Sequence, residues 1–265
     1  MTDQMQSPQN ERKVILKLDG VCKAFGGVIA AENVSFDVYT GEILGLIGPN
    51  GAGKTTILNV VSGIYDVDDG RIFLGDEEIT NAAAHKRARM GISRTFQQPR
   101  FLQRSDIRDN LLLGTDLAEQ FGFWRSFWHK KGLNFKEELD ELMDIAGFSL
   151  KWDADISSLP YGQRKLLEII RAMLSHPRVM LVDEPAAGLN SSEIERAVAL
   201  LRLATDKKGM GVVLIEHSMD MVMNTCHNIV VLNFGRLIAQ GTPEQVSSNG
   251  DVIVAYLGRG FNAEN

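Results

Sequence analysis

The residue pattern in this sequence that could most directly do chemistry is a glycine-rich stretch ending in lysine and threonine. Residues 48–55 have the sequence GPNGAGKT, which fits the spacing Gly-x-x-x-x-Gly-Lys-Ser/Thr. Such glycines let backbone N–H groups converge on phosphate oxygens, and the start of a following helix adds a favourable dipole. We expect Lys54 to reach the β- and γ-phosphates of a nucleotide and the Thr55 hydroxyl to bind Mg²⁺. The residues predicted to bind the nucleotide here are Gly48, Asn50, Gly51, Ala52, Gly53, Lys54, Thr55 and Thr56.

A second pattern is a pair of carboxylates at the end of an apolar run. Residues 179–184 have the sequence VMLVDE, which predicts a buried strand ending in Asp183 and Glu184. Asp183 would hold Mg²⁺ through water, and Glu184 would polarise the attacking water as a general base. By itself such a pair more often marks an ordinary strand-to-loop turn. Together with the phosphate loop in the same chain, it favours a catalytic role.

The composition of the 265-residue chain argues against several classes of protein. Its net charge of −6 is unlike the basic excess of proteins that bind nucleic-acid backbones. No run approaches the roughly 18 apolar residues of a membrane-spanning helix, and residues 1–10 show no export signal. Cys22 and Cys226 give neither a disulfide framework nor a metal-binding spacing. A reducing cytosol fits best, and if a membrane is involved, a partner crosses it.

The elements that must position these residues follow from hydrophobic periodicity. The predicted strands are residues 34–38, 42–48, 179–182 and 211–215, with a hairpin over 229–240 that turns at 233–235. The predicted helices are residues 54–62 with a stop at Gly63, 162–174, and one that begins at a capping box of Ser192 and Glu195 and ends near Gly209. Buried strands alternating with helices indicate a largely parallel sheet with antiparallel strands at its edges.

One part of the chain differs in character from this α/β pattern. Residues from about 76 to 157 are richer in charge and aromatic side chains, with helical spacing of Leu139, Met143 and Ala146 ahead of Gly147. We expect residues 1–12 to be a disordered tail and 13–265 a single domain, with a helical lobe at about 90–175 inserted in the α/β core.

Two features of this region allow alternative interpretations. The aromatic cluster at residues 121–128 would fill the core of the lobe, with docking of a membrane-domain helix as the alternative. The basic run at residues 86–89 would be a solvated helix face, with contact to lipid headgroups or acidic partners as the alternative.

Further segments, in a fixed order, resemble the motifs of the ABC ATPases. Residues 159–163, LPYGQ, look like a variant of the Leu-Ser-Gly-Gly-Gln signature, placed just before the Asp183 strand as in that family. Residues 94–97, RTFQ, resemble the Q-loop; 187–190, AGLN, the D-loop; and 216–217, EH, the switch-histidine segment. Phe25 lies where the family has the aromatic ring that stacks on adenine. A lone histidine or phenylalanine would more often be structural, and it is the order of the motifs that favours ligand contact.

This resemblance implies a P-loop NTPase core of the RecA-like α/β class, with an antiparallel β sub-sheet at its edge and an inserted helical lobe. It further implies hydrolysis of ATP to ADP and phosphate at a site shared by two subunits. The residues with implied catalytic roles are Lys54, Gln97, Glu184 and His217. The implied Mg²⁺ ligands are Thr55, Gln97 and Asp183, and the contacts made in trans by the partner's signature are Tyr161, Gly162 and Gln163.

The sequence departs from the family pattern at two places. Pro160 stands where the family has a serine whose hydroxyl reaches the γ-phosphate, and Tyr161 replaces the first glycine of the signature. Proline suits a helix start, so we expect the helix to remain and one phosphate contact to be lost. Asn190 stands where most ABC ATPases have aspartate.

These variants, together with the tail at residues 255–258, look like the ATPase subunits of branched-chain amino-acid importers. That resemblance implies a second, usually different, ATPase subunit, two transmembrane permeases and, indirectly, a periplasmic solute-binding protein, with no nucleic-acid partner. The chain would then lie on the cytoplasmic face of a prokaryotic cell membrane. An exporter ATPase and, less in keeping with a single phosphate loop, a soluble ABC ATPase are the alternatives.

Overall fold

The computed structural model describes residues 13–112, 130–149 and 154–257 and arranges their strands in two sheets. A four-stranded antiparallel sheet has the order β2-β1-β4-β5, and a six-stranded sheet has the order β10-β9-β3-β8-β7-β6. The first consists of β1 (Val14–Phe25), β2 (Val28–Tyr39), β4 (Asp69–Leu74) and β5 (Glu77–Glu78). The second consists of β3 (Ile43–Ile47), β6 (Ile92–Arg94), β7 (Val179–Asp183), β8 (Gly211–Ile215), β9 (Asn228–Asn233) and β10 (Arg236–Gly241).

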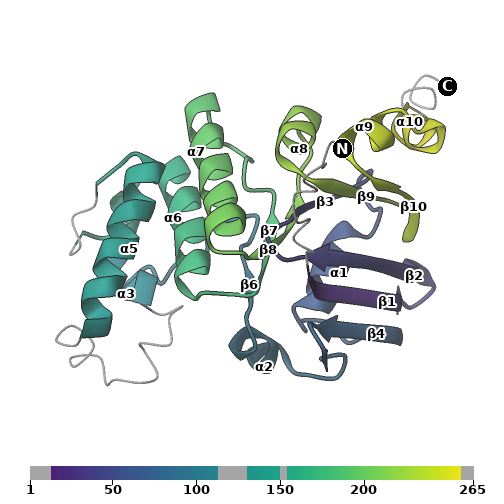
Figure 1. Ribbon diagram of the computed structural model, residues 1–265, viewed down its shortest axis with the longest axis horizontal. Coiled ribbons are helices and arrows are strands. Elements are labelled where there is room, and N and C mark those ends of the chain that lie inside the picture. Colours follow the sequence, from purple (N-terminus) through teal and green to yellow (C-terminus); the bar gives the residue numbers. More distant parts are fainter. Residues whose placement is uncertain (1–12, 113–129, 150–153, 258–265) are drawn as a thin grey trace, which may run out of the picture.

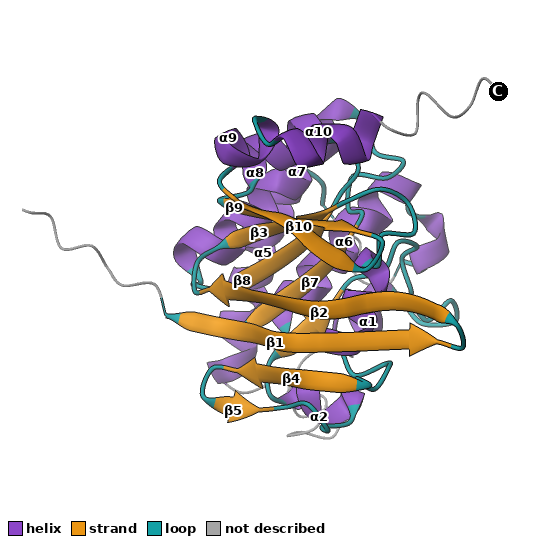
Figure 2. Cartoon of the chain, turned by 90° about the vertical axis from the view of Figure 1, so that its right-hand side faces the viewer, coloured by secondary structure: helices purple, strands orange, loops and turns teal. Residues whose placement is uncertain are grey.

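All neighbours in the six-stranded sheet run parallel except β10, which pairs antiparallel with β9 at the edge. The β9–β10 hairpin turns at Phe234 and Gly235, both with positive φ, as a tight two-residue turn requires. Figure 2 shows β2, β1, β4 and β5 lying side by side as the separate antiparallel sheet. The predicted α/β class with an antiparallel sub-sheet is therefore confirmed.

The central strands are buried along their whole length because both faces of the sheet are covered. In β3, Ile43 and Ile47 belong to a core shared with the helices, whereas Leu44 and Leu46 belong to a core shared with α1 and the antiparallel sheet. Residues of β7 and β8 alternate between the two cores in the same way. This follows from the two-residue repeat of a strand, which sends successive side chains to opposite faces.

Helices α3 (Ile107–Leu112), α5 (Lys130–Ala146) and α6 (Tyr161–Leu174), with the short turn η2 (Ile156–Ser158), come between β6 and β7 in the chain. Figure 1 shows α3, α5 and α6 gathered at the end of the molecule away from β1, β2 and β4. The predicted apolar stripe of Leu139, Met143 and Ala146 is buried on α5. The aromatic residues at 121–128 lie outside the described residues.

The remaining helices cover the sheet and the C-terminal side of the molecule. They are α1 (Lys54–Val61), α2 (Ala84–Arg89), α7 (Ser191–Arg202) with its π-helical extension η3 (Leu203–Lys207), α8 (Met219–Thr225), α9 (Pro243–Ser247) and α10 (Gly250–Leu257). None of the helices in the described ranges has the length and apolar character needed to cross a membrane.

Two local predictions are wrong. Helix α7 begins earlier than expected, and its capping box is formed by Asn190 and Glu193, not by Ser192 and Glu195. Asn190 Oδ1 accepts the Glu193 N–H at 3.1 Å, and Glu193 Oε2 accepts the Asn190 N–H at 2.9 Å. Asparagine and serine are both good N-caps, so the spacing of the acidic residue alone did not fix the start.

The second wrong prediction concerns Arg87, which is 1% exposed instead of lying on a solvated face with its neighbours in the basic run. Its guanidinium donates to the backbone oxygens of Val60 at 2.6 Å, Val61 at 2.9 Å, Thr80 at 2.7 Å and Ala82 at 2.8 Å. The carbonyls at the end of α1 have no donors within the helix, and a cation at that end is favoured by the helix dipole.

Candidate functional site

The glycine-rich loop connects β3 to α1, and two of its glycines are dictated by close backbone contacts. A Cβ atom on Gly48 (φ 150°) would lie 2.1 Å from the Leu232 carbonyl oxygen, and one on Gly53 (φ 103°) 2.1 Å from the Ala30 carbonyl oxygen. The backbones of β9 and β2 therefore press against this loop from two sides. Only glycine satisfies both the contact and the positive φ.

The lysine of this loop folds back over it. Lys54 is 6% exposed, and its Nζ donates to the carbonyl oxygens of Gly48 at 2.8 Å and Pro49 at 3.1 Å. The ammonium has only neutral carbonyl acceptors here, and it lies in a loop with several glycine N–H groups. Both features favour the binding of an anion such as a phosphate. Thr55, the next residue, is exposed in the first turn of α1.

The strand β7 ends in Asp183, whose carboxylate is buried at the carboxyl end of the parallel strands. Burial raises the pKa of the Asp183 carboxyl, while the nearby Arg94 guanidinium acts in the opposite direction. Arg94 Nη2 lies 3.5 Å from Asp183 Oδ2, and the side chains of the pair are 9% and 8% exposed. The Asp183 N–H donates to Thr95 Oγ1 at 3.3 Å.

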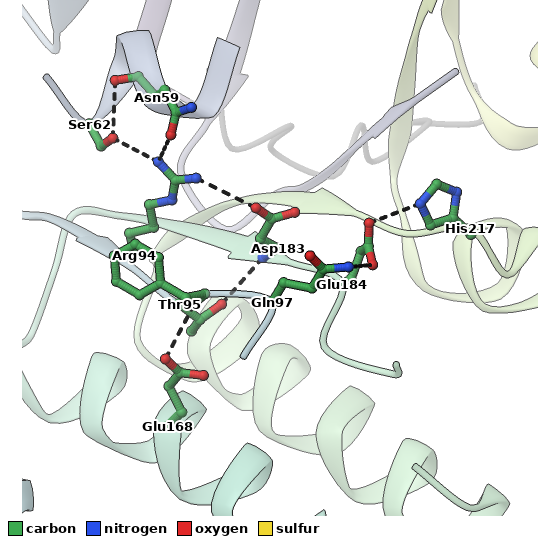
Figure 3. A network of polar contacts seen from close by, with 10 residues as sticks. Asn59, Ser62, Arg94, Thr95, Gln97, Glu168, Asp183, Glu184 and His217 are labelled. Atoms are coloured by element: carbon green, nitrogen blue, oxygen red, sulfur yellow. Dashed lines mark hydrogen bonds and ion pairs between the residues drawn. The ribbon is translucent and has the colours of Figure 1, made fainter. Parts of the chain in front are cut away.

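Arg94 connects this carboxylate to α1. Its Nη1 donates to Asn59 Oδ1 at 2.6 Å and to Ser62 Oγ at 3.0 Å (Figure 3). The guanidinium carbon also lies 5.3 Å from the centre of the Phe96 ring. Sequence reasoning used Arg94 only as part of the RTFQ motif and missed this role, because nothing in the spacing of the sequence pairs it with Asn59 or Ser62.

The neighbouring Glu184 is bound by two of the residues predicted to act with it. Gln97 Nε2 donates to Glu184 Oε2 at 2.8 Å, and His217 Nε2 lies 2.9 Å from Glu184 Oε1 (Figure 3). The three residues follow β6, β7 and β8, whose carboxyl ends meet at one edge because these strands are parallel. The structure thus brings together Gln97, Asp183, Glu184 and His217, as the sequence motifs predict.

Glu216 fixes the loop that follows Glu184, and sequence reasoning gave it no role. Its Oε1 accepts the Ala186 N–H at 2.7 Å and its Oε2 accepts the His217 N–H at 3.0 Å. A buried carboxylate that accepts two backbone N–H groups holds both loops in one geometry. Its position directly before His217 is the only signal in the sequence that could have pointed to it.

The signature segment lies against the D-loop and the start of α7. Pro160 is the N-cap of α6 without a side-chain capping bond, and its carbonyl accepts the Arg164 N–H at 3.1 Å. A Cβ on Gly162 would lie 2.1 Å from Glu193 Oε1, so a larger residue there would displace the Glu193 carboxylate, and Gly188, with φ 78°, would bring a Cβ 2.9 Å from the Tyr161 ring. Within the part of the chain that the structure describes, no hydrogen bond joins Tyr161, Gly162 or Gln163 to Lys54 or Glu184.

The aromatic residue predicted at the adenine position is open to solvent. Phe25 ends β1 and is 44% exposed. Its ring meets Tyr65 edge to face, with centroids 5.1 Å apart, and Lys23 Nζ lies 5.5 Å from its centre. Lys23 thus lies over one face of the ring, and the 44% of the residue that is exposed leaves part of the ring accessible for stacking.

The donor set fits Mg²⁺ better than a transition metal. Asp183, Thr55 and Gln97 offer carboxylate, hydroxyl and amide oxygens, the ligands that Mg²⁺ prefers. No group of three or more His, Cys, Asp or Glu side chains that could hold a metal ion occurs among the residues described. A metal here would therefore depend on phosphate oxygens and water for most of its coordination, as is usual for Mg²⁺ bound with a nucleotide.

Comparison with protein families gives two matches. The family described as "ABC transporter" matches residues 31–187, and the family described as "Branched-chain amino acid ATP-binding cassette transporter" matches residues 236–262. Among curated proteins, the chain is 39% identical over 251 residues to the high-affinity branched-chain amino acid transport ATP-binding protein BraF of Pseudomonas aeruginosa, covering 92% of this chain and 98% of that one. It is 37% identical, with the same coverage, to LivG of Escherichia coli, which carries the same description.

Solved structures agree with this. The chain superimposes on the ADP conformation of an ATP-binding cassette of an ABC transporter with a TM-score of 0.78 at 31% identity, covering 92% of this chain and 99% of that one. A nucleotide-free ATP-binding cassette from an ABC transporter gives a TM-score of 0.77 at 30% identity, covering 92% and 98%.

Proposed function

This chain belongs to the ABC transporter family as an ATP-binding and ATP-hydrolysing subunit, and on that premise we propose that it energises the import of branched-chain or other hydrophobic amino acids. The names of BraF and LivG and the branched-chain family match at residues 236–262 support this solute class. The chemistry that drives transport is hydrolysis of ATP to ADP and phosphate.

The observation that carries the catalytic proposal is Glu184, held between Gln97 and His217 beside the Asp183 carboxylate. Glu184 takes the proton of the attacking water as general base, which is a contribution of about 10²-fold to 10⁴-fold. His217 orients this carboxylate and can donate a hydrogen bond to the transferred phosphoryl group. Lys54 exchanges its loop carbonyls for phosphate oxygens, which bear more negative charge.

Thr55, Gln97 and Asp183 would hold Mg²⁺, which when bound neutralises charge on the phosphates. The protein contributes the buried carboxylate of Asp183, kept in place by Arg94 and by the Thr95 hydroxyl that accepts its N–H. Burial raises the pKa of this carboxyl, while the Arg94 guanidinium acts in the opposite direction, and a bound cation would favour the ionised form further.

The ATP site is completed by a second subunit. The start of α6 presents the first N–H groups and the positive end of the helix dipole, and its Tyr161 is 39% exposed. The partner is a second ABC ATPase, and a different chain is favoured because the importers that this chain resembles usually pair two.

The complex further contains two transmembrane permeases and works with a periplasmic solute-binding protein, and this chain lies at the cytoplasmic face of the membrane. The test is to purify the full-length tagged chain from the membranes of its native host and identify what accompanies it. Two permeases of an amino-acid importer and a second ATPase are expected. Uptake of radiolabelled leucine should also be lost when Lys54→Ala replaces the wild type. Unchanged leucine uptake, or partners of an exporter, would contradict the proposed function.

A further inference from the structure

Helix α6 carries a buried lysine, Lys165, two residues after the signature segment. Lys165 is 2% exposed. Burying an ammonium is costly unless the group is paired and hydrogen-bonded. Burial lowers the pKa of Lys165, and the carboxylates of Glu168, Glu216, Glu184 and Asp183 act in the opposite direction.

The partner of this ammonium is the backbone of the general base. Lys165 Nζ donates to the Glu184 carbonyl oxygen at 2.9 Å. The Glu184 N–H donates to the Ile215 carbonyl oxygen at 2.9 Å. Both backbone groups of Glu184 are therefore held: the N–H by β8, and the carbonyl oxygen by Lys165 of α6 and, at the longer distance of 3.3 Å, by the Ala187 N–H.

Glu184, whose two backbone groups are held in this way, has an unfavourable backbone conformation. Glu184 has φ 48°, in the left-handed region that non-glycine residues seldom adopt. Such a conformation costs on the order of 1–3 kcal/mol and persists only where its surroundings fix it. With this backbone conformation the Glu184 carboxylate reaches Gln97 and His217, so a change in the backbone at Glu184 is expected to move the carboxylate relative to both.

We infer that Lys165 is a positioning residue for ATP hydrolysis, which holds the left-handed backbone of Glu184 and thereby aims its carboxylate at the attacking water. Misplacing a catalytic group by about 1 Å can lower a rate by about 10²-fold. The ammonium does not touch the reacting atoms in this role. It acts only through Glu184.

Glu168, one turn further along α6, makes a parallel contact with the Q-loop. Its Oε1 accepts the Phe96 N–H at 3.3 Å, next to Gln97 (Figure 3). The helix that begins with the signature thus holds the base segment through Lys165 and the Gln97 segment through Glu168. On the proposed function, in which the start of α6 contacts ATP across the subunit interface, this connection links the ATP of one site to the base of the other.

The test is a double-mutant cycle in the full-length chain, with Lys165→Met, Glu184→Gln and both changes together. Turnover is measured by phosphate release and ATP affinity by equilibrium binding. Lys165→Met should lower kcat by about 10²-fold and leave ATP affinity within about threefold, because the phosphate loop is untouched. Lys207→Met, an exposed lysine outside the site, is the control and should behave as the wild type.

The cycle separates positioning from a general structural role. If Lys165 acts through Glu184, the double variant is no more than about threefold slower than Glu184→Gln, because the group that Lys165 aims is already absent. Losses that multiply to about 10⁴-fold, or a Lys165→Met variant with wild-type kcat, would overturn the inference. If Lys165→Met fails to fold or bind ATP, Lys165→Gln is measured, and the same failure there would show a purely structural residue and also overturn it.

The dimer on which the link between sites rests is tested separately. Gel filtration of Glu184→Gln together with the second ATPase that co-purifies with it, in ATP and Mg²⁺, should show a dimer, and the variant that also carries Lys165→Met should show the same dimer, because Lys165 is only 2% exposed and offers almost no surface to a partner. A monomer in both variants would count against the proposed shared site and leave the effect of Lys165 on kcat to be judged from the cycle. A dimer lost only with Lys165→Met would show that the lysine supports the interface, which contradicts the positioning role.

Discussion

Replacing Arg94 by alanine would leave the Asp183 carboxylate buried without its nearest cation. The two side chains are 9% and 8% exposed, and Arg94 also donates to Asn59 and Ser62 at the end of α1. The substitution therefore removes an ion pair and two hydrogen bonds at once, while Asp183 keeps its place at the end of a buried strand.

The expected loss of stability follows from this geometry. Two unit charges 3.5 Å apart attract by about 5 kcal/mol at an effective dielectric constant of about 20. Removing one partner of a buried pair typically destabilises a protein by about 3–5 kcal/mol, because the other charge is left without compensation. We expect Arg94→Ala to lower the free energy of unfolding by about that amount.

Arg71→Ala is a matched control. Arg71 Nη2 lies 3.1 Å from Asp19 Oδ2, which is closer than the Arg94 pair, but these side chains are 60% and 42% exposed. An exposed pair contributes about 0–1 kcal/mol. Urea unfolding followed by far-ultraviolet circular dichroism gives both values from the midpoint and slope. A loss below about 1 kcal/mol for Arg94→Ala, or equal losses for the two variants, would refute the reasoning.

Three further predictions concern positions where the chain departs from expectation or buries a reactive group. Pro160→Ser should raise the free energy of unfolding by about 0.5–1 kcal/mol, because serine supplies the side-chain cap that α6 lacks, and ATPase activity should be kept or raised. Lower stability or a severe loss of activity would show that proline is needed at the helix start. Asn190→Ala should lower the free energy of unfolding by about 1 kcal/mol because it removes the capping box of α7, whereas Asn190→Asp should keep the cap. Equal melting temperatures for the two variants would argue against a stabilising cap at Asn190. Burial raises the pKa of the Cys226 thiol to about 12, so iodoacetamide at pH 8 should alkylate the half-buried Cys22 well before Cys226, and the rate of alkylation at Cys226 should rise with pH. Mass spectrometry measures the alkylation of each cysteine, and faster alkylation of Cys226 than of Cys22 would contradict its burial.

Much of the site could be predicted because its residues sit at the ends of strongly periodic elements. The strand β7 is apolar up to its last residue, Asp183, and β8 has no polar side chain, which places Asp183 and His217 at the same end of the sheet as soon as the strands are parallel. The phosphate loop lies between a buried strand and a helix as its glycines require. The turn at Phe234 and Gly235 follows from the Asn-Phe-Gly sequence between two apolar runs.

The rest of the fold and of the site could not be predicted, because it depends on contacts between segments that are distant in the sequence. Hydrophobic periodicity carries no information about those contacts. Arg87 looks solvated within a basic run, yet carbonyls from α1, more than twenty residues earlier, enclose its guanidinium. Lys165 lies on a helix with strong amphipathic spacing, but nothing in that spacing shows that its partner is the carbonyl of Glu184. The start of α7 was misplaced because Asn190 and Ser192 both suit a cap, and only the hydrogen bonds with Glu193 decide between them.

The most direct test of the catalytic site is the turnover of ATP by Glu184→Gln, measured beside the wild type with Lys54→Ala as a control for binding. The substitution keeps the shape of the side chain and removes the base, so the variant should bind ATP with wild-type affinity and hydrolyse it about 10²-fold or more slowly. Lys54→Ala should fail to bind ATP. Hydrolysis by Glu184→Gln at the wild-type rate would contradict the assignment of Glu184, and with it the site built from Gln97, Asp183 and His217.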